Sequence, residues 1–265
     1  MRFPNKVVWI TGASSGIGEA LAHAFAAEGA RLVLSSRRPE ELERVRAACP
    51  RSEAHLVVPL DLTKPDSFAA AVAGVEREAG KVDMLVNNGG VSQRALAMDT
   101  SAAVERALLE VNYFGQVALT KAVLPGMRTQ RAGHIVVVSS VMGYIGTPGR
   151  SSYAAAKHAL HGYFDSLRAE VWRDGIKVTL ACPGYVKTSV SANALGGDGD
   201  RHGITDATHE HGIPAVKCAR VIVNAVARGR EDVAVGGPEV MAIYLKRWFP
   251  WLASRIIRRL QFVTK

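Results

Sequence analysis

The chain has 265 residues, of which 48% are hydrophobic and 22% are charged. This length and apolar content allow one domain with a full core, and no uninterrupted apolar stretch reaches the roughly 18 residues that a membrane-spanning helix needs. The formal net charge is +9. Such a charge would suit an acidic partner or surface, but the sequence holds no nucleic-acid recognition motif, so we expect no nucleic-acid binding.

The start of the chain and its cysteines indicate a reducing compartment. The first expected strand begins at Lys6, which leaves no room for a charged and then apolar secretory signal. Cys49, Cys182 and Cys218 are scattered without metal-ligand spacing, so we expect free thiols that pack in the core. We therefore expect a cytoplasmic protein.

Short apolar runs alternate with helical segments along the whole chain. This order predicts an α/β fold with a single Rossmann-like, doubly wound parallel sheet of about seven strands and helices on both faces. Residues 1–237 would form that domain, and residues 238–265 would be a C-terminal helical extension. The expected strands are Lys6–Ile10, Arg31–Ser36, His55–Leu60, Asp83–Asn87, His134–Ser139, Ile176–Ala181 and Asp232–Val235.

A glycine-rich turn follows the first strand. Thr11–Gly18 reads TGASSGIG, and Glu19–Glu28 after it has helical composition and period. Glycines let the backbone approach a pyrophosphate, and the helix N-terminus beyond them offers unpaired N–H groups to the anion. The spacing is GxxxGxG rather than GxGxxG, so the turn by itself leaves a purely structural role open.

Tyr153 and Lys157 form a second motif, SSYAAAK. Residues four apart on a helix share a face, so the phenol and the ammonium would lie side by side. The cation would lower the pKa of Tyr153 from about 10 toward the range of a general acid or base. YxxxK alone would fit an ordinary surface pair. Ser140, thirteen residues before the tyrosine, and the glycine turn favour a catalytic site.

These motifs, with Asn87–Gly90 (NNGG), Asn112 and Cys182–Thr188 (CPGYVKT), resemble the short-chain dehydrogenase/reductase family from Lys6 to about Val235. The resemblance implies an oxidoreductase with a catalytic tetrad of Asn112, Ser140, Tyr153 and Lys157. Ser140 would fix the substrate oxygen, Tyr153 would exchange its proton, and Lys157 would bind the nicotinamide ribose. Ser139 is assigned to the strand.

Asn112 is expected inside a long helix that starts near Ser101. The resemblance implies that its side chain helps to hold a water in a proton relay to Lys157. A buried amide that satisfies only its own helix is the alternative.

The end of the second strand favours NADP(H) over NAD(H). Arg37 and Arg38 follow Ser36, which stands where an NAD enzyme would have an acidic residue, and an arginine fork can pair with a 2′-phosphate. Two solvated arginines are the alternative. Asp61 would lie beside the adenine or cap a helix starting near Pro65. The implied cofactor residues are Gly12, Ser14, Ser15, Gly16, Ile17, Gly18, Arg37, Arg38, Asp61, Leu62, Asn88, Gly89, Tyr153, Lys157, Pro183, Gly184, Val186 and Thr188.

Apolar residues near the catalytic motifs indicate a lipophilic alcohol or ketone as substrate. An insert, Ser189–Pro214, contains GGDGD and few apolar residues, which predicts a mobile lid over the substrate. Its His202, His209 and His211 lack further ligands, so we expect no metal site. The expected substrate residues are Ser140, Met142, Tyr144, Tyr185, Val190 and Leu195.

The insert narrows the resemblance. PGYVKTSVSANALGGDGDRHG, together with LRAEV at Leu167–Val171, resembles the dehydrogenase/reductase group called member 7 and 7B, relatives of the 11β-hydroxysteroid dehydrogenases. That resemblance implies steroid-, retinoid- or lipid-like substrates. The alternative within enzymes is a 3-oxoacyl-carrier-protein or acetoacetyl-CoA reductase. A non-catalytic NADP-sensing or scaffold protein is the alternative of another class, against which the intact tetrad argues.

The C-terminal extension is basic and amphipathic. Lys246–Lys265 holds six cations and no acidic residue, and Pro250 should divide the extension into two short helices. Apolar residues recur at helical spacing, which suits peripheral contact with an anionic membrane at its inner face. Packing in a homodimer or homotetramer interface, or against the lid, is the alternative. The apolar residues are Trp251, Leu252, Ile256, Ile257, Leu260 and Val263, with Arg255, Arg258 and Arg259 on the opposite side.

Overall fold

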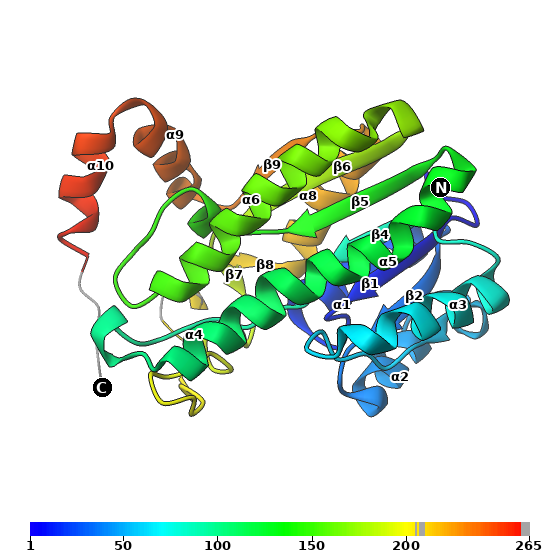
Figure 1. Ribbon diagram of the computed structural model, residues 1–265, viewed down its shortest axis with the longest axis horizontal. Coiled ribbons are helices and arrows are strands. Elements are labelled where there is room, and N and C mark those ends of the chain that lie inside the picture. Colours follow the sequence, from blue (N-terminus) through cyan, green and yellow to red (C-terminus); the bar gives the residue numbers. More distant parts are fainter. Residues whose placement is uncertain (205, 207–209, 261–265) are drawn as a thin grey trace.

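Seven parallel strands form the centre of the protein, in the order β3-β2-β1-β4-β5-β6-β9. The computed structural model describes residues 1–204, 206 and 210–260. The predicted doubly wound α/β fold is confirmed (Figure 1). The strands are β1 (Val7–Thr11), β2 (Arg31–Ser35), β3 (Leu56–Val57), β4 (Met84–Asn87), β5 (Gly133–Val138), β6 (Ile176–Pro183) and β9 (Asp232–Val235).

Helices cover both faces of the sheet and divide the core in two. Because side chains alternate along a strand, Val8 and Ile10 of β1 enter one half of the core, whereas Val7 and Trp9 enter the other. One face carries α1 (Gly16–Ala27), α2 (Pro39–Ala47) and α8 (Ala215–Ala227). The other face carries α3 (Phe68–Ala79), α5 (Gly115–Gln130) and α6 (Ser151–Val171), and α4 (Ala102–Leu109) packs against α6.

The order of the strands places a crevice at their carboxyl ends. β1 pairs with β2 on one side and with β4 on the other, so the chain crosses the sheet in opposite directions from this point. Loops leaving neighbouring strands diverge there, and ligands of open α/β sheets bind in the resulting crevice. The glycine turn follows β1, and the NNGG segment begins at the last residue of β4.

Two elements differ from the sequence-based expectation. The third strand is two residues long instead of the predicted His55–Leu60. It lies at the edge of the sheet, and the chain beyond it stays beside β2 through bonds from the N–H groups of Val58 and Leu60 to the carbonyls of Leu34 and Ser36. The helix capped by Ser101 does begin as expected, but it is interrupted by a π-helical turn, η4 (Glu110–Phe114), which carries Asn112.

The insert begins and ends on a small two-stranded sheet. β7 (Val186–Lys187) pairs in parallel with β8 (Ile213–Pro214), so the two ends of the insert lie together. His209 lies outside the described residues. The remaining short elements are 3₁₀ turns, namely η1 (Ser52–Ala54), η2 (Pro65–Ser67), η3 (Ala97–Asp99), η5 (Val141–Gly143), η6 (Trp172–Asp174) and η7 (Pro238–Val240).

The C-terminal extension forms two short helices, as predicted. α9 (Met241–Trp248) and α10 (Pro250–Ile257) pack on each other at the end of the molecule toward which the strands of the sheet point (Figure 1). Pro250 starts α10, where its missing N–H costs nothing. Val263 and Lys265 lie outside the described residues. Within the part of the chain that is described, no helix combines the length and the apolar character needed to cross a bilayer.

Candidate active site

A cleft of about 1110 Å³ runs along the carboxyl ends of the strands. It is lined at one end by the glycine turn and the loop after β2, and at the other by the segment after β5, the insert and the C-terminal helices. All the residues named from the sequence as cofactor or substrate contacts line it, except Gly18 and Tyr144. Among the described residues, no group of three His, Cys, Asp or Glu could hold a metal ion.

The glycine turn forms a cradle with no space for side chains. Gly12 and Gly16 have φ of 65° and 60°, which glycine adopts without strain. A Cβ on Gly12 would lie 2.8 Å from Cα of Gly89, and one on Gly18 would strike the carbonyl oxygen of Gly12. Gly18 therefore acts by packing rather than by lining the cleft. Ser15, the N-cap of α1, makes no side-chain cap bond, so this helix N-terminus fits an anionic group such as a pyrophosphate.

The two arginines after β2 differ in their contacts. Arg38 donates from one terminal nitrogen to the hydroxyls of Ser14 and Ser15, at 2.9 and 3.3 Å, and so lies over the glycine turn. Arg37 is exposed at the rim of the cleft. Both positions fit a phosphate on the adenosine side of a dinucleotide.

Asp61 lies in the cleft and does not cap a helix. Its carboxylate accepts bonds from the backbone N–H and the hydroxyl of Thr63, at 3.0 and 2.9 Å, whereas η2 begins only at Pro65. Burial opposes ionisation, but the bonds from Thr63 and the charges of Arg37 and Lys64 lower the pKa of Asp61. Of the two roles expected, the capping role is therefore wrong, and an anionic group remains at this edge of the cleft.

The NNGG segment is tied to the glycine turn. Asn88 donates from its side chain to the carbonyl oxygens of Thr11 and Gly12, at 3.0 and 3.3 Å. A methyl group on Gly89 would lie 2.8 Å from a methyl of Leu62. Leu62 thus packs closely against Gly89, and a larger residue there would require this methyl group to shift.

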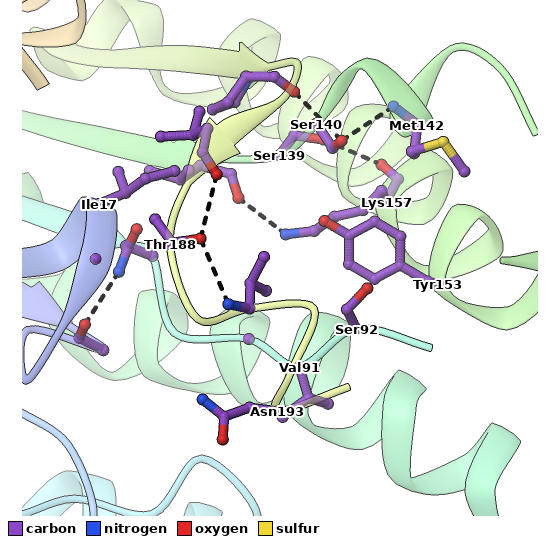
Figure 2. A pocket seen from close by; sticks show the side chains of 18 of the residues that line it. Ile17, Val91, Ser92, Ser139, Ser140, Met142, Tyr153, Lys157, Thr188 and Asn193 are labelled. Carbon is purple, nitrogen blue, oxygen red and sulfur yellow. Dashed lines mark hydrogen bonds between the residues drawn. The ribbon is translucent and has the colours of Figure 1, made fainter. Parts of the chain in front are cut away.

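Ser140, Tyr153 and Lys157 meet at the other end of the cleft. The Ser140 hydroxyl is hydrogen-bonded to Tyr153 and accepts the backbone N–H of Met142 at 3.1 Å. The Lys157 ammonium lies 5.7 Å from the centre of the Tyr153 ring and donates to the carbonyl of Val138 at 2.9 Å. Figure 2 shows the three polar ends around one point of the cleft, with Ser92 close to the tyrosine. One turn of α6 and the end of β5 therefore bring an acid/base pair and a hydroxyl together.

Burial dominates the ionisation of this group. It raises the pKa of Tyr153, although the bond from Ser140 and the charges of Arg150 and Arg94 act in the opposite direction. The sequence-based expectation of a pKa lowered by Lys157 is therefore not met in this structure. Burial also lowers the pKa of Lys157 to about 8. Burial thus favours the neutral phenol, whereas a pKa of about 8 still leaves Lys157 mostly charged at neutral pH.

Asn112 holds the backbone beside the catalytic group. It is fully buried, and its side chain accepts the N–H of Val91 and donates to the carbonyl of the same residue, both at 2.8 Å. The alternative of an amide that satisfies only its own helix is therefore wrong, because the side chain bonds the segment after β4, whereas the role in holding a water stays a prediction. The π-helical turn places the Asn112 side chain against the segment after β4, where it lies close to Gly90.

Tyr144 does not line the cleft, contrary to expectation. Its ring packs on His161, with centroids 4.4 Å apart, and its hydroxyl bonds the Cys182 thiol. Nε2 of His161 lies 2.9 Å from the Ser139 hydroxyl, so this hydroxyl is engaged by His161, although Ser139 also lines the cleft. Ser139, Tyr144, His161 and Cys182 form a polar cluster where the ends of β5 and β6 meet α6. Cys49, Cys182 and Cys218 are all buried free thiols.

Much of the apolar wall of the cleft comes from residues that were not predicted to line it. Residues of the C-terminal helices line it, although the sequence placed them in a separate extension. The apolar residues at helical spacing in the C-terminal segment indicated a buried face, but the sequence did not show which surface they pack against. They are Ala242 and Leu245 of α9, Ala253, Ile256 and Ile257 of α10, and Leu260.

A second omission is the segment Ser92–Gln93–Arg94. Gln93 is fully buried, and its side-chain oxygen accepts the backbone N–H groups of Ser152 and Tyr153 at the start of α6, at 2.9 and 3.2 Å. Arg94 is bound to Asp206 of the insert, at 2.6 Å. These polar residues follow β4 closely, and the position of a segment just after a parallel strand could have indicated a role in the site.

Comparison with known proteins agrees with this geometry. Residues 6–197 match the family model described as short chain dehydrogenase. The chain is 46% identical to "Dehydrogenase/reductase SDR family protein 7-like" of Anopheles gambiae, covering 95% of this chain and 80% of that protein. It is 42% identical to "Dehydrogenase/reductase SDR family member 7B" of Bos taurus, covering 96% of this chain and 80% of that protein.

A solved short-chain dehydrogenase from Streptomyces avermitilis is similar in structure, with a TM-score of 0.83, 31% sequence identity and coverage of 97% of this chain and 99% of that one. The chain therefore belongs to the short-chain dehydrogenase/reductase family of nicotinamide-dependent oxidoreductases and, within it, to the member 7 and 7B group.

Proposed function

We propose that the protein is an NADP(H)-dependent oxidoreductase that interconverts a lipophilic secondary alcohol and a ketone. The observation that carries the proposal is the convergence of Ser140, Tyr153 and Lys157 at one point of a cleft whose far wall is apolar. Acid/base, hydroxyl and ammonium groups at one point are what carbonyl reduction or alcohol oxidation requires.

Each polar residue has a distinct task in this proposal. The Ser140 hydroxyl fixes the substrate oxygen, and Tyr153 gives a proton to that oxygen in reduction or takes it in oxidation. Lys157 keeps a positive charge beside the phenol, which stabilises the phenolate while the proton is away. Asn112 supports this group through the backbone of Val91. When bound in the cleft, the nicotinamide would supply or accept the hydride.

The preference for NADP(H) is supported by the cations at the adenosine end. Arg38 already donates to two hydroxyls of the glycine turn, and Arg37 lies exposed at the rim, where its charge acts on Asp61. Ser36, which lines the cleft between β2 and these arginines, brings no charge that would repel a 2′-phosphate.

The apolar wall supports a steroid-, retinoid- or lipid-like substrate. Met142, Val190 and Leu195 line the cleft together with apolar residues of α9 and α10. Such a surface gains free energy by removing apolar area from water, at roughly 25 cal/mol per Å². A small polar carbonyl compound would leave most of this wall uncovered.

The outer face of α9 and α10 supports contact with an anionic membrane from the cytoplasm. Trp248 and Trp251 are 72% and 68% exposed, and Lys246, Arg247 and Arg255 lie exposed among them. Aromatic rings with cations are typical of interfacial helices. We also propose a homodimer or homotetramer, to be measured by sedimentation velocity.

A substrate panel tests the proposed activity. Purified protein is incubated with steroid, retinoid and aliphatic ketones and alcohols, and with NADPH or NADH, and the absorbance of the reduced cofactor is followed. We expect turnover of lipophilic compounds with NADPH. Turnover only of a carrier-linked 3-oxoacyl or acetoacetyl-CoA substrate would favour that reductase instead. Cofactor binding without turnover of any compound would favour the non-catalytic sensor.

A further inference from the structure

The insert is fastened to the segment that follows β4. The N–H of Leu195 donates to the carbonyl of Ser92 at 2.9 Å, and the N–H of Arg94 donates to the carbonyl of Leu195 at 2.8 Å. Leu195 lines the cleft on the substrate side. The backbone of Ser92–Gln93–Arg94 therefore sets the distance between this wall and the catalytic group.

A buried ion cluster makes a second connection. Arg94 places its Nε and Nη2 atoms 2.8 and 2.6 Å from one carboxylate oxygen of Asp206, and Nη2 of Arg150 lies 2.9 Å from the same oxygen. The Arg94 side chain is 2% exposed. Its Nη1 atom donates to the Ser92 hydroxyl and the Gln93 carbonyl, at 2.8 and 2.7 Å, so the guanidinium is held in one position.

This cluster lies next to the reacting tyrosine. Arg150 is the N-cap residue of α6, three residues before Tyr153, and lines the cleft with it. The positive charges of Arg150 and Arg94 both favour the phenolate form of Tyr153. Asp206 is the anion that balances these two cations, and it belongs to the insert rather than to the sheet.

The charged and titratable groups around Tyr153 and its two arginines come from several elements, among them Tyr185, which follows β6 and interacts with Arg150. Lys157 lies on α6 itself, Arg150 precedes that helix, and Arg94 follows β4. The insert brings Asp206 together with His202, whose Nε2 lies 3.6 Å from the second carboxylate oxygen. Two arginines at low exposure share a single carboxylate, so removing its charge leaves a buried cation without compensation, which is costly.

We propose that Asp206 is a positioning residue for the reaction: through Arg94 and Arg150 it holds the insert as a wall of the substrate cleft and limits the pull of these two cations on the Tyr153 proton. This inference rests on the proposed role of Tyr153. One carboxylate would then have two effects, because the same ion pairs that hold the insert in place also neutralise Arg94 and Arg150. The position of the insert and the acidity of the catalytic tyrosine are then coupled.

Asp206→Asn tests the proposal because it keeps the size of the side chain and removes its charge. In the reductive direction Tyr153 must be protonated, so the rate falls as pH rises through its pKa. With the arginines unbalanced, we expect this fall at a pH about 0.5–1 unit lower than in the parent. We also expect KM for the lipophilic substrate to rise about tenfold and amide hydrogen exchange within residues 190–204 to become faster.

Asp200→Asn is the matched control, because it makes the same change on the same insert at an exposed side chain. We expect the parental pH profile and KM. NADP(H) affinity should be unchanged in both variants, since the cluster lies at the substrate end of the cleft. An Asp206→Asn protein with the parental pH profile and KM would overturn the proposal.

Arg150→Gln provides a test with the opposite sign, and it decides the question if Asp206→Asn does not fold. It removes one cation and leaves the Arg94–Asp206 pair, so the fall of the reductive rate should move to higher pH. A shift to lower pH, or none, would contradict the proposal. Tyr153→Phe distinguishes failure of the proposed function from failure of this inference. Substantial turnover by Tyr153→Phe would refute the proposed function. If Tyr153→Phe loses turnover but the Asp206 and Arg150 variants keep the parental pH profile, only the positioning role of Asp206 is refuted.

Discussion

The side-chain oxygen of Gln93 accepts the backbone N–H of Tyr153 at 3.2 Å and that of Ser152 at 2.9 Å. The first N–H groups of a helix have no partner within the helix, and α6 has no side-chain cap at Arg150. A fully buried amide from another loop takes that place and fixes the turn that carries the proposed acid/base. The catalytic helix is thus held at its N-terminus by the segment after β4.

Gln93→Leu should destabilise the protein. It removes the acceptor at the start of α6 and the bond to the Thr100 hydroxyl at 2.9 Å, so buried donors lose their partners. We expect the free energy of unfolding to fall by about 2 kcal/mol, measured by urea denaturation. Gln93→Glu keeps the acceptor at the positive end of the helix and should lose less. Equal losses in the two variants would argue against the capping role.

Tyr153→Phe should keep cofactor affinity and lose turnover by a factor of about 10²–10⁴, because only the exchangeable proton is removed. Lys157→Ala should weaken both. Tyr163→Phe is the control, since Tyr163 lies on the same helix but packs against Tyr113 and Phe164. Steady-state kinetics with the best substrate of the panel, and cofactor titration by fluorescence, give the two readouts.

Lys157→Met should abolish activity and yet stabilise the protein at neutral pH. The pKa of Lys157 in the folded chain is about 8, below its ordinary value of 10.5, because burial disfavours the ammonium. Below pH 8 the folded state bears the full cost of the buried charge. That cost disappears as pH rises through 10.5, where both states are neutral.

We therefore expect Lys157→Met to raise the free energy of unfolding by about 1–3 kcal/mol at pH 7, with the gain vanishing toward pH 10.5. The lost bond to the Val138 carbonyl reduces the gain. Denaturation at several pH values measures it. A destabilised variant at pH 7 would show that the ammonium is stabilised by its surroundings instead.

Arg38→Ala should weaken NADP(H) binding by about 1–3 kcal/mol, the scale of hydrogen bonds to charged groups, and change NAD(H) binding little. Arg37→Ala should act in the same direction. Arg46→Ala is the control, because Arg46 lies on α2 and pairs with Glu43. Calorimetric titration with both cofactors decides the matter, and tighter binding of NAD(H) by the parent would contradict the proposed preference.

Trp248→Ser combined with Trp251→Ser should reduce binding to anionic vesicles. Both rings are exposed on the outer side of α9 and α10, and each cation nearby adds up to about 1 kcal/mol at such a surface. Trp172→Ser is the control, since that ring is 64% exposed at the end of α6. Co-sedimentation at low and high salt gives the affinity. Equal binding by the double variant and the parent would leave the patch as an oligomer contact.

Much of the fold could be predicted because its signals are local. Alternating apolar strands and helices predicted the doubly wound sheet, and the spacing of Ser140, Tyr153 and Lys157 predicted that they meet, as they do at one end of the cleft. The length of β3 could not be predicted, because an edge strand with a proline depends on its neighbour for its register. The π-helical turn at Asn112 is set by the segment after β4, which the local sequence does not show.

Residue types at fixed spacings on one strand or helix were enough to predict the α/β class, a nucleotide-binding glycine turn and the family. Only the tertiary structure decided that α9 and α10 supply an apolar wall, that Tyr144 turns away toward Cys182, and that Gln93 caps the catalytic helix. It also brought Asp206 to Arg94, 112 residues away along the chain. Contacts between segments this distant depend on how several elements pack together, and no local periodicity records them.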